Sequence, residues 1–348
     1  MSTILYFGDT NPSSTAFHRA NALKRLGHTV IIKDPEQKAN ELPFYKYTRP
    51  IHYRSGFILI QGAILNWISQ IMEDSIRPDI VWVNSGELFG KKCLQKLKAY
   101  QCPIVLYNND DPTGHRDGRR FRSLIPAIPL YDLCVVMREI NIQEFKEKGA
   151  KKTLRVFMSY DEFFHLPLPD ENQNPAEYKS AVAFIGSWIR NEKRDEFILE
   201  LIKQDIPVSI WGGRWPKSPY WKVLKKHYKG DSLSGKDYVA AIQGSSICLG
   251  LLSKGNRDLH TQRSLEVPYA GGLLCAERTA EHLSMYKEGE EAFFWKDAKE
   301  CAEICKRLLK DDQLRQSVRY AGMQKVRTNH SGNEQVCKII LNELTIDL

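Results

Sequence analysis

The sequence has little that points to a membrane or to the outside of the cell. Its 348 residues do not begin with a basic region and a long apolar stretch, so a secretory signal is not expected. Eight cysteines are scattered along the chain, mostly inside apolar runs. Cys301 and Cys305 are one helical turn apart, but no second ligand pair lies near them in the sequence. We therefore interpret them as helix packing rather than a metal site, and we expect a reduced, cytoplasmic protein.

Long apolar runs are also lacking. The stretch Phe57–Met72 is uncharged and largely apolar, but its 16 residues fall short of a membrane span. Two interpretations stay open for this stretch. We favour a helix of the protein core, and the alternative is a helix lying on a membrane surface. The alternative would give the protein a peripheral contact at the inner face of the membrane.

Clustered positive charge is scarce, although the net charge is +8. The basic residues are dispersed, with clusters only at 116–122 and 222–229, and neither cluster has the aromatic spacing of an RNA-binding motif. A nucleic-acid partner is therefore not expected. The content of 42% hydrophobic and 26% charged residues is typical of a globular protein. A chain of 348 residues is long for one core, so we expect two domains.

The most informative stretch runs from Ile247 to Glu277. Its apolar run at 247–252 predicts a buried parallel strand, and a short helix is expected from near Thr261 to the Gly271-Gly272 pair. A second apolar run follows at 273–276. Strand, loop, helix and strand form the connection of a doubly wound α/β sheet, in which ligands bind at the carboxyl ends of the strands. The polar residues of this connection are Asp258, His260, Gln262, Arg263 and Glu266.

Two acids in this connection, Asp258 and Glu266, are eight positions apart. Together with the small residues and glycines that follow, they resemble the two-acid motif of retaining glycosyltransferases of the GT-B fold. Asp258 departs from that motif, because the broader retaining families usually carry Glu at this place. The longer pattern is similar to the glycosyltransferase-like family named for spore-coat maturation proteins. Its strings are Arg263-Ser264-Leu265-Glu266 through Gly272, Ala276-Glu277-Arg278 and Gly289-Glu290-Glu291.

The resemblance implies a nucleotide-sugar donor, UDP- or GDP-linked, and neither a cofactor nor a metal ion. It implies that Glu266 positions the donor ribose and that Asp258 belongs to the catalytic centre. Carboxylates can accept paired hydrogen bonds from vicinal hydroxyls, and an acid near a helix start is favoured by the helix dipole. Backbone amides at that helix start, with Arg263 and His260, are candidates for holding the diphosphate.

A basic loop after the strand expected at 181–185 carries further candidates. In retaining GT-B enzymes the equivalent loop supplies a basic pair to the donor diphosphate, which implies catalytic roles for Arg190, Lys193 and Arg194. Cations are needed there because departure of a nucleoside diphosphate builds negative charge. The next strand, expected at 208–211, ends in a loop that resembles the one beside the nucleotide base. The other donor-binding residues expected in these two loops are Gly186, Ser187, Gly212 and Gly213.

The first domain is expected to supply the acceptor side. A strand at Ile4–Phe7 ends at Gly8, and Ser14 is a candidate N-cap for the next helix, although a plain strand–helix turn explains both equally well. A later strand runs into an acidic tip, Asn108-Asn109-Asp110-Asp111, which either contacts the acceptor or simply turns the chain. The Asp-any-Asp metal motif of GT-A enzymes is absent there because position 109 is Asn. The predicted acceptor-side residues are Gly8, Ser14, Asp110, Asp111 and His115.

The implied architecture is α/β, a GT-B fold of two Rossmann-like domains with parallel sheets facing a central cleft. The expected segments are an acceptor-side domain at 1–165, a linker at 166–180, a nucleotide-sugar-binding domain at 181–330, and a helix at 331–348 that returns to the first domain. Residues 35–56, rich in Pro and Tyr, are expected to be irregular.

The implied reaction is transfer of a sugar to a glycan, lipid-linked or protein acceptor, with retention and without a metal ion. The expected setting is bacterial-type glycan or glycoconjugate synthesis. Two alternatives stay open. One is an inverting transferase whose general base comes from His18, His115 or the Asp110-Asp111 tip. The other is a non-catalytic relative with a structural or binding role.

Overall fold

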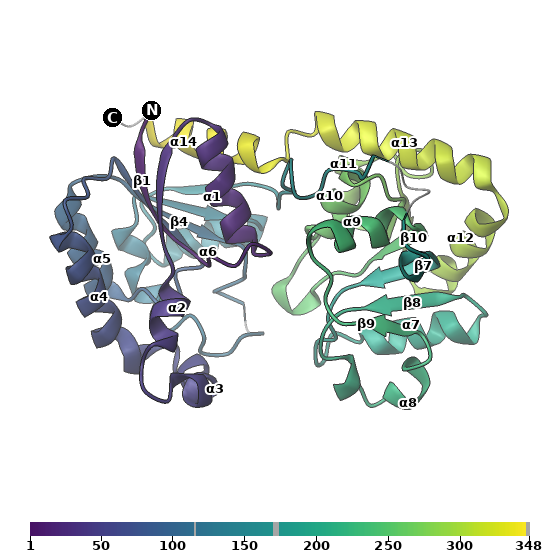
Figure 1. Cartoon of the computed structure of the whole chain (residues 1–348), viewed down its shortest axis with the longest axis horizontal. Coiled ribbons are helices and arrows are strands. Elements are labelled where there is room, and N and C mark those ends of the chain that lie inside the picture. Colours follow the sequence, from purple (N-terminus) through teal and green to yellow (C-terminus); the bar gives the residue numbers. More distant parts are fainter. Residues whose placement is uncertain (115, 170–173, 346–348) are drawn as a thin grey trace. The chain divides into compact units, whose positions relative to one another are not determined.

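The computed structural model describes residues 1–114, 116–169 and 174–345. They form two units, each built on one parallel sheet, which we call the first and second domains (Figure 1). The first domain comprises Met1–Phe157, Gly255–Arg257 and Asn333–Leu348, and the second comprises Met158–Lys254 and Asp258–Gly332. The two parallel sheets confirm the fold class expected from the sequence, which is two Rossmann-like domains.

The first domain ends at Phe157 rather than near residue 165. Two contacts of the segment after Phe157 lie within the second domain. The amide of Met158 donates to the imidazole of His260, and Tyr160 pairs with Gly332. The linker expected at 166–180 includes residues 170–173, which lie outside the described residues.

The sheet of the first domain has six parallel strands in the order β2-β1-β3-β4-β5-β6. The strand bounds are β1 Thr3–Phe7, β2 Thr29–Lys33, β3 Ile80–Asn84, β4 Ile104–Asn108, β5 Leu133–Val136 and β6 Thr153–Arg155. The helices are α1 Thr15–Arg25, α2 Pro35–Asn40, α3 Tyr45–Ser55, α4 Gln61–Glu73, α5 Lys91–Leu97, α6 Glu139–Glu147 and α14 Asn333–Thr345. Short 3-10 turns in the described part of this domain are η1 Ile58–Ile60, η2 Lys98–Tyr100 and η3 Ile125–Leu130.

Most of residues 35–56 are helical, in α2 and α3, so the expectation of irregular chain was wrong. Local capping explains the first of the two helices. The Asp34 carboxylate accepts hydrogen bonds from the amides of Glu36 and Gln37, and Pro35 stands at the first helical position, where its missing N–H costs nothing. The composition of this segment suggested a loop because Pro and polar residues occur both in loops and at helix starts.

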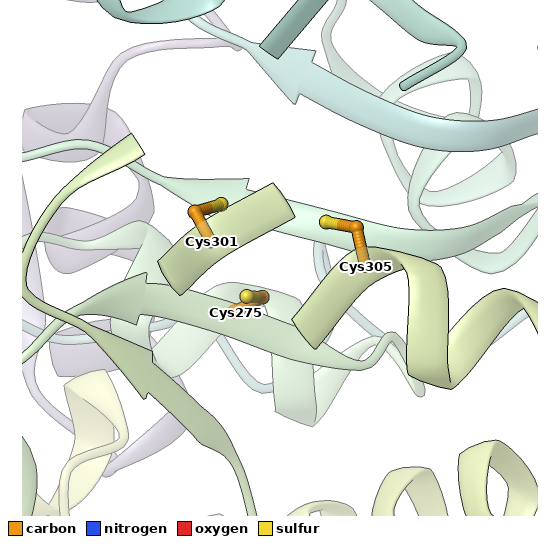
Figure 2. Close-up of side chains that lie close together, drawn as sticks. All are labelled: Cys275, Cys301 and Cys305. Carbon is orange, nitrogen blue, oxygen red and sulfur yellow. The ribbon is translucent and has the colours of Figure 1, made fainter. Parts of the chain in front are cut away.

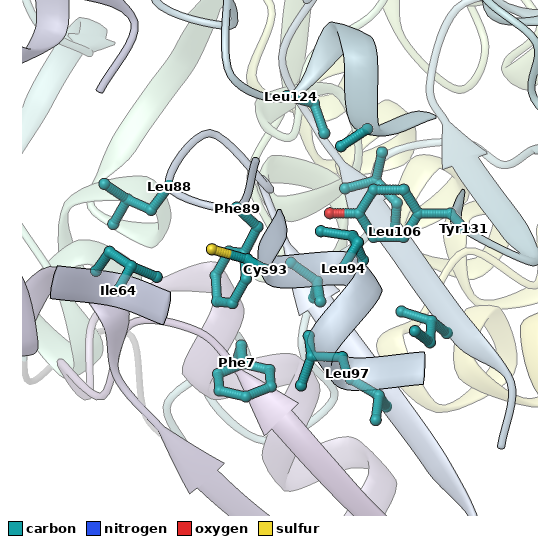
Figure 3. Packing of buried hydrophobic residues seen from close by; sticks show 14 of the residues in the cluster. Phe7, Ile64, Leu88, Phe89, Cys93, Leu94, Leu97, Leu106, Leu124 and Tyr131 are labelled. Atoms are coloured by element: carbon teal, nitrogen blue, oxygen red, sulfur yellow. The ribbon is translucent and has the colours of Figure 1, made fainter. Parts of the chain in front are cut away.

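The core of the first domain lies between its sheet and the helices α4 and α5 (Figure 3). Helix α4 presents Ile64, Ile68 and Ile71 to this core at helical spacing, and all three are buried. Phe7 from β1 and Leu94 from α5 belong to the same cluster. The apolar stretch that begins at Phe57 is therefore a core element, as favoured from the sequence. No helix in the described part of the chain is both long and apolar enough to cross a membrane.

The other face of the same sheet carries three aromatic side chains in a row. Tyr6, Trp82 and Tyr107, from the adjacent strands β1, β3 and β4, are fully buried and stack with ring centroids 6.1 Å and 6.0 Å apart. Alternation along a strand places them opposite the α4 core. Helices α1 and α14 pack against each other in the same domain.

The second domain has a six-stranded parallel sheet in the order β12-β11-β10-β7-β8-β9. The strand bounds are β7 Ser180–Ile185, β8 Val208–Trp211, β9 Tyr228–Gly230, β10 Ser245–Gly250, β11 Leu274–Glu277 and β12 Phe293–Trp295. The helices are α7 Arg194–Lys203, α8 Trp221–Leu224, α9 Gly235–Gln243, α10 Arg263–Tyr269, α11 Ala280–Met285, α12 Ala298–Lys310 and α13 Asp312–Thr328. The 3-10 turns are η5 Ala176–Tyr178, η6 Trp215–Lys217 and η7 Lys254–Asn256.

Replacing Ile64 by alanine tests the role of α4. We expect Ile64→Ala to lower the free energy of unfolding of the first domain by about 2–5 kcal/mol, because the side chain is fully buried and its loss leaves a cavity. Asn66→Ala, on the exposed side of the same helix, should change it by less than about 0.5 kcal/mol. Urea denaturation followed by circular dichroism measures both. Equal effects of the two substitutions would contradict the core assignment.

Candidate functional site

The order of the strands reverses in the second domain between β7 and β10. From β7 the chain proceeds outward through β8 and β9, and from β10 it proceeds outward through β11 and β12 on the other side. The loops that leave the carboxyl ends of β7 and β10 therefore diverge. Such a reversal opens a crevice at the sheet edge, which is where ligands bind in open α/β sheets. The basic loop after β7 and the connection after β10 that carries Asp258 and Glu266 border this crevice.

Two charged side chains connect the diverging loops. The Arg194 guanidinium donates from Nη1 to the carbonyl of Ser187 (2.9 Å), after β7, and from Nη2 to the carbonyl of Leu252 (3.3 Å), after β10. The Glu192 carboxylate accepts from the amide of Lys254 (2.7 Å) and the hydroxyl of Ser253 (3.2 Å). Both residues thus hold the walls of the crevice at a set spacing.

The three residues of the basic loop have different surroundings. Arg194 is half-buried and its guanidinium donates hydrogen bonds to the two loop carbonyls, whereas Arg190 and Lys193 have exposed side chains. Lys193 also has a positive φ of 54°, at the turn that starts α7. The arrangement gives Arg194 a role in positioning the loop, which the sequence did not indicate. A catalytic role for the three cations stays a prediction.

The glycines of the two donor-side loops allow a close approach of two backbones. A Cβ on Gly212 would lie 2.3 Å from the carbonyl oxygen of Gly186, and Gly212 has a φ of +139° that favours glycine. The amide of Gly212 donates to the carbonyl of Gly230, and the amide of Gly186 donates to the carbonyl of Trp211. The amide of Gly213 donates to the Ser232 hydroxyl. Because these amides already have acceptors, the glycines shape the crevice and do not form a cradle of open N–H groups.

Glu266 lies on α10 with its side chain almost fully buried. Its Oε2 accepts hydrogen bonds from the hydroxyl of Tyr238 (2.7 Å) and from Nη1 of Arg263 (3.2 Å), and its Oε1 is 3.6 Å from Nε2 of His165. Arg263 also donates to the carbonyl of Ile185, the last residue of β7 (3.3 Å). The pair of Glu266 and Arg263 therefore stands at the strand reversal.

His260 has contacts within the second domain through both ring nitrogens, and its predicted place beside a diphosphate stays a prediction. Nε2 of the imidazole accepts a hydrogen bond from the amide of Met158 (2.9 Å), so Nδ1 carries the proton and donates to the carboxylate of Glu281. The side chain is 2% exposed. With both ring nitrogens engaged inside the domain, His260 anchors the start of the second domain. The contact of His260 with Met158 joins residues far apart in the sequence, which spacing does not reveal.

Asp258 lies in the loop between η7 and α10 and is also buried, and its amide donates to the carbonyl of Ser253 (3.3 Å). Its predicted catalytic role stays a prediction.

A cavity of about 310 Å³ lies at the carboxyl ends of β1, β3 and β4 in the first domain. Ser14 and Asp110, two of the predicted acceptor-side residues, line this cavity. The Ser14 hydroxyl caps α1 by accepting a hydrogen bond from the amide of Phe17 (3.1 Å). Asp110 pairs with Arg120 (2.9 Å). The full lining is Asp9, Ser14, Thr15, Ala16, Arg19, Glu36, Arg49, Asn84, Ser85, Glu87, Tyr107, Asn109, Asp110 and Arg120.

Asp111 does not line this cavity, and its predicted acceptor-side role stays a prediction. Its carboxylate is buried and forms a bidentate pair with Arg257, with Nε–Oδ2 at 2.6 Å and Nη2–Oδ1 at 2.7 Å. Arg257 also pairs with Glu144, and Nδ2 of Asn141 donates to Asp111. Burial by itself raises the pKa of Asp111, but the hydrogen bonds from Arg257 and Asn141 hold it below its ordinary value.

Of the remaining first-domain candidates, Gly8 and His18 have close contacts within the domain, and His115 is not among the described residues. A Cβ on Gly8 would approach the Tyr6 ring at 2.8 Å and Nδ2 of Asn84 at 2.9 Å, so only glycine fits this turn. His18 donates from Nε2 to the carbonyl of Pro12 (2.8 Å), which limits it as a general base. His115 lies outside the described residues.

Three cysteines come together in the core of the second domain (Figure 2). Cys275 from β11 joins Cys301 and Cys305 from α12, and their sulfur atoms lie within 4.8 Å of one another. The sequence spacing suggested only the helical pair. Hydrogen bonds with Cys301 and Cys305, together with burial, raise the pKa of the Cys275 thiol, which favours the neutral form. Structural zinc sites use four ligands, whereas this group within the described residues has three, so packing remains our interpretation.

Sequence reasoning missed several residues of the two sites. Arg257 and Tyr238 gave no signal, because the first has its acid partners far away in the sequence and the second lies in an ordinary helical pattern. Arg19 of α1, which was not among the candidates from the sequence, is 2% exposed. The only available signal was its position on the face of α1 that carries Ala22 and Leu23.

Comparison with known proteins agrees with this geometry. Residues 190–340 match the family described as "Glycosyl transferase-like". Sucrose-phosphate synthase from Thermosynechococcus elongatus superposes with a TM-score of 0.71 at 11% identity, covering 100% of both chains. HepE of Anabaena, in complex with UDP and glucose, gives 0.64 at 13% identity, covering 99% of this chain and 100% of that chain. The chain therefore has the GT-B fold of these structures, and its residues 190–340 match a glycosyltransferase-like family. No curated protein matches its sequence.

A third structure extends the likeness of this GT-B protein. An α,α-trehalose-phosphate synthase (UDP-forming) from Burkholderia xenovorans superposes with a TM-score of 0.68 at 11% identity, covering 99% of this chain and 100% of that chain. The family match begins at Arg190, in the basic loop, and extends into α14. The motifs that carried the resemblance in the sequence lie inside the matched region.

Replacing Gly212 by alanine tests the close approach of the donor-side loops. We expect Gly212→Ala to lower the free energy of unfolding of the second domain by roughly 2–5 kcal/mol, because the new Cβ meets Gly186 and the backbone conformation is strained. Gly230→Ala, on the neighbouring strand, has open space beyond 3.9 Å and should change it by at most about 1 kcal/mol. Thermal unfolding of both variants measures the difference. A Gly212→Ala variant as stable as the wild type would disprove the packing argument.

Proposed function

We propose that this protein transfers a sugar from a nucleotide-sugar donor, bound by the second domain, to an acceptor bound by the first domain. The observation that carries the proposal is the buried acid Glu266 with Arg263, standing where the strand order reverses between β7 and β10. Ligands of open α/β sheets bind at this place. A buried carboxylate held by several hydrogen-bond donors is fixed in its orientation, so it suits recognition of a diol.

The donor is proposed to be UDP-linked. Among the similar structures, HepE of Anabaena was solved with UDP, with UDP and glucose, and with UDP-glucose. The similar trehalose-phosphate synthase is described as UDP-forming. These neighbours support UDP over GDP as the nucleotide of this chain's donor.

The acid and the basic loop would have separate tasks. Glu266 would bind the ribose hydroxyls of the donor. The exposed Arg190 and Lys193 would meet the diphosphate, while Arg194 holds the loop through its two carbonyl contacts. Fixed cations stabilise the negative charge that develops on a departing diphosphate, so the proposal needs no metal ion. Retention of the anomeric configuration is proposed from the two-acid pattern of Asp258 and Glu266.

Substitution of Glu266 tests the donor site. We expect Glu266→Gln to weaken UDP binding by roughly 1.5–3 kcal/mol, about 10- to 150-fold, because a charge-assisted hydrogen bond to the ribose is lost. Glu200→Gln, an exposed acid on α7, is the matched control and should bind UDP as the wild type does. Isothermal titration calorimetry measures the affinities. Equal affinity of Glu266→Gln and the wild type would remove the main support for the proposal.

Substitution of Arg190 tests the leaving-group role. We expect Arg190→Ala to lower the rate of UDP release from UDP-glucose by roughly 10- to 100-fold at saturating donor, because the charge it meets develops in the transition state. Lys203→Ala, a surface cation on α7, should leave the rate unchanged. The rate is followed by an assay for UDP in the absence of acceptor. A rate unaffected by Arg190→Ala would show that the diphosphate is held by other residues.

A further inference from the structure

Arg19, on α1 of the first domain, is a buried cation without an acidic partner. Its side chain is 2% exposed, and Nη1 donates to Oδ1 of Asn84 (2.8 Å). The guanidinium lies over the ring of Tyr107, 3.5 Å from its centroid. Among the described residues, its Nε has no hydrogen-bond partner and no carboxylate forms an ion pair with it. A buried charge is costly unless it is paired, so this arrangement calls for a counter-ion.

The neighbouring cations differ from Arg19 in this respect. Arg49 and Arg120 line the same cavity, and each pairs with an acid. Arg49 pairs with Glu36 (2.6 Å), and Arg120 pairs with Asp110 (2.9 Å) and with Glu87. Their charges are therefore balanced inside the protein. Arg19 lines the same cavity but, among the described residues, forms no such pair with an acid.

The groups closest to Arg19 do not supply that negative charge. Its electrostatic neighbours are Tyr6, Tyr107 and Cys337. Burial raises the pKa of Tyr6 far above its usual value, so its phenol stays neutral, and its hydroxyl donates to the carbonyl of Ala16 (2.6 Å). The stack of Tyr6, Trp82 and Tyr107 lies beneath α1 and gives the guanidinium a rigid support. Arg19 is thus held in place before any ligand arrives.

The start of α1 borders the same cavity and adds a second attraction for an anion. Ser14, Thr15 and Ala16 line the cavity, and α1 has eleven residues with no acid in its first turn. The Ser14 hydroxyl already takes the amide of Phe17. The amides of Thr15 and Ala16 have no intrahelical carbonyl to bind, and the helix dipole makes this end positive. A cation and a helix N-terminus therefore border one cavity of about 310 Å³.

We propose that Arg19 and the first turn of α1 bind an oxyanion carried by the acceptor, which makes the acceptor a phosphorylated or carboxylated sugar. The assignment of this anion to an acceptor rests on the proposed function. The paired charges of Asp110, Glu36 and Arg49 along the cavity would meet the hydroxyl groups of the same sugar. A neutral sugar or a lipid chain alone would leave Arg19 without a counter-ion.

Ligand-dependent thermal stability tests this proposal, because a ligand that binds only the folded state raises the melting temperature. The probes are glucose 6-phosphate, glucuronic acid, glucose, inorganic phosphate and UDP, each added alone to the full chain. We expect glucose 6-phosphate or glucuronic acid to raise the melting temperature, whichever carries the preferred oxyanion, and glucose to leave it unchanged. No shift with either charged sugar would overturn the proposal. A shift with inorganic phosphate equal to that with both sugars would overturn the assignment to a sugar.

Arg19→Met retains the apolar stem of the side chain and removes its charge. We expect it to weaken binding of the charged sugar on the order of 10- to 100-fold, since a charge-assisted contact is lost. The melting temperature of the free variant should be equal to or higher than that of the wild type, because an unpaired buried charge is removed. Lys24→Met, an exposed cation on the same helix, is the matched control and should change neither quantity. Undiminished sugar binding in Arg19→Met would overturn the proposal.

A second variant keeps the test decisive if Arg19→Met does not fold. Thr15→Pro removes one first-turn amide at the first helical position, where proline is well tolerated, and Ser14 already has the extended backbone that precedes proline. It should weaken binding of the charged sugar several-fold, whereas Thr15→Val, which keeps the amide, should not. Unchanged binding in Thr15→Pro would contradict the helix contribution.

UDP separates failure of this inference from failure of the proposed function. UDP should stabilise Arg19→Met and Thr15→Pro as much as the wild type, because its proposed site lies in the second domain. Stabilisation by UDP without any effect of the charged sugars would overturn the proposal of a charged acceptor but would not contradict the proposed function. Loss of the UDP effect in Arg19→Met would show that the bound anion is the donor diphosphate, and would overturn the assignment to the acceptor.

Discussion

Arg194 and Glu192 connect two loops that are separated by about sixty positions in the sequence. Their contacts are needed because the strands from which these loops emerge lead the chain in opposite directions across the sheet. Without these hydrogen bonds the crevice between the loops would have no defined width, and the loop opposite Glu266 and Arg263 would be free to move. The Arg194 guanidinium donates to a backbone carbonyl in each loop. It fixes the distance between the loops more firmly than an apolar contact would, because hydrogen bonds are directional. The site of the second domain is therefore organised by charge before it binds anything.

The two domains use an arginine in comparable ways. In each, the helix that follows the first strand carries an arginine that reaches the carboxyl edge of the sheet, Arg19 on α1 and Arg194 on α7. The Arg194 guanidinium donates hydrogen bonds to two loop carbonyls and lies 5.9 Å from the centroid of the Phe184 ring. Arg19 lies directly over an aromatic ring and bonds one amide side chain. The same residue type thus closes a loop in one domain and remains able to bind an anion in the other.

The strands and the long helices were predictable from the sequence because each is an apolar run of characteristic length or spacing, as in β10 and α4. The place of Glu266 near the sheet edge was also predictable, since it follows from the order of strand, loop and helix. The surroundings of His260 and Asp111 were not, because their partners Met158 and Arg257 are more than a hundred positions away. Helix α2 was missed for a different reason. Its start depends on one capping carboxylate rather than on any apolar pattern.

Helix α14 has a consequence for how the protein is made. It belongs to the first domain, packs against α1 and buries Val336, Cys337 and Ile340, and Arg25 of α1 pairs with Glu334 at 2.6 Å. In the sequence α14 follows the whole second domain, whereas α1 precedes it. Domains generally fold in the order of their synthesis, but the first domain here cannot bury one side of α1 until the second domain and α14 have been synthesised. The nascent chain must therefore keep that apolar surface from aggregating while the whole second domain is being synthesised.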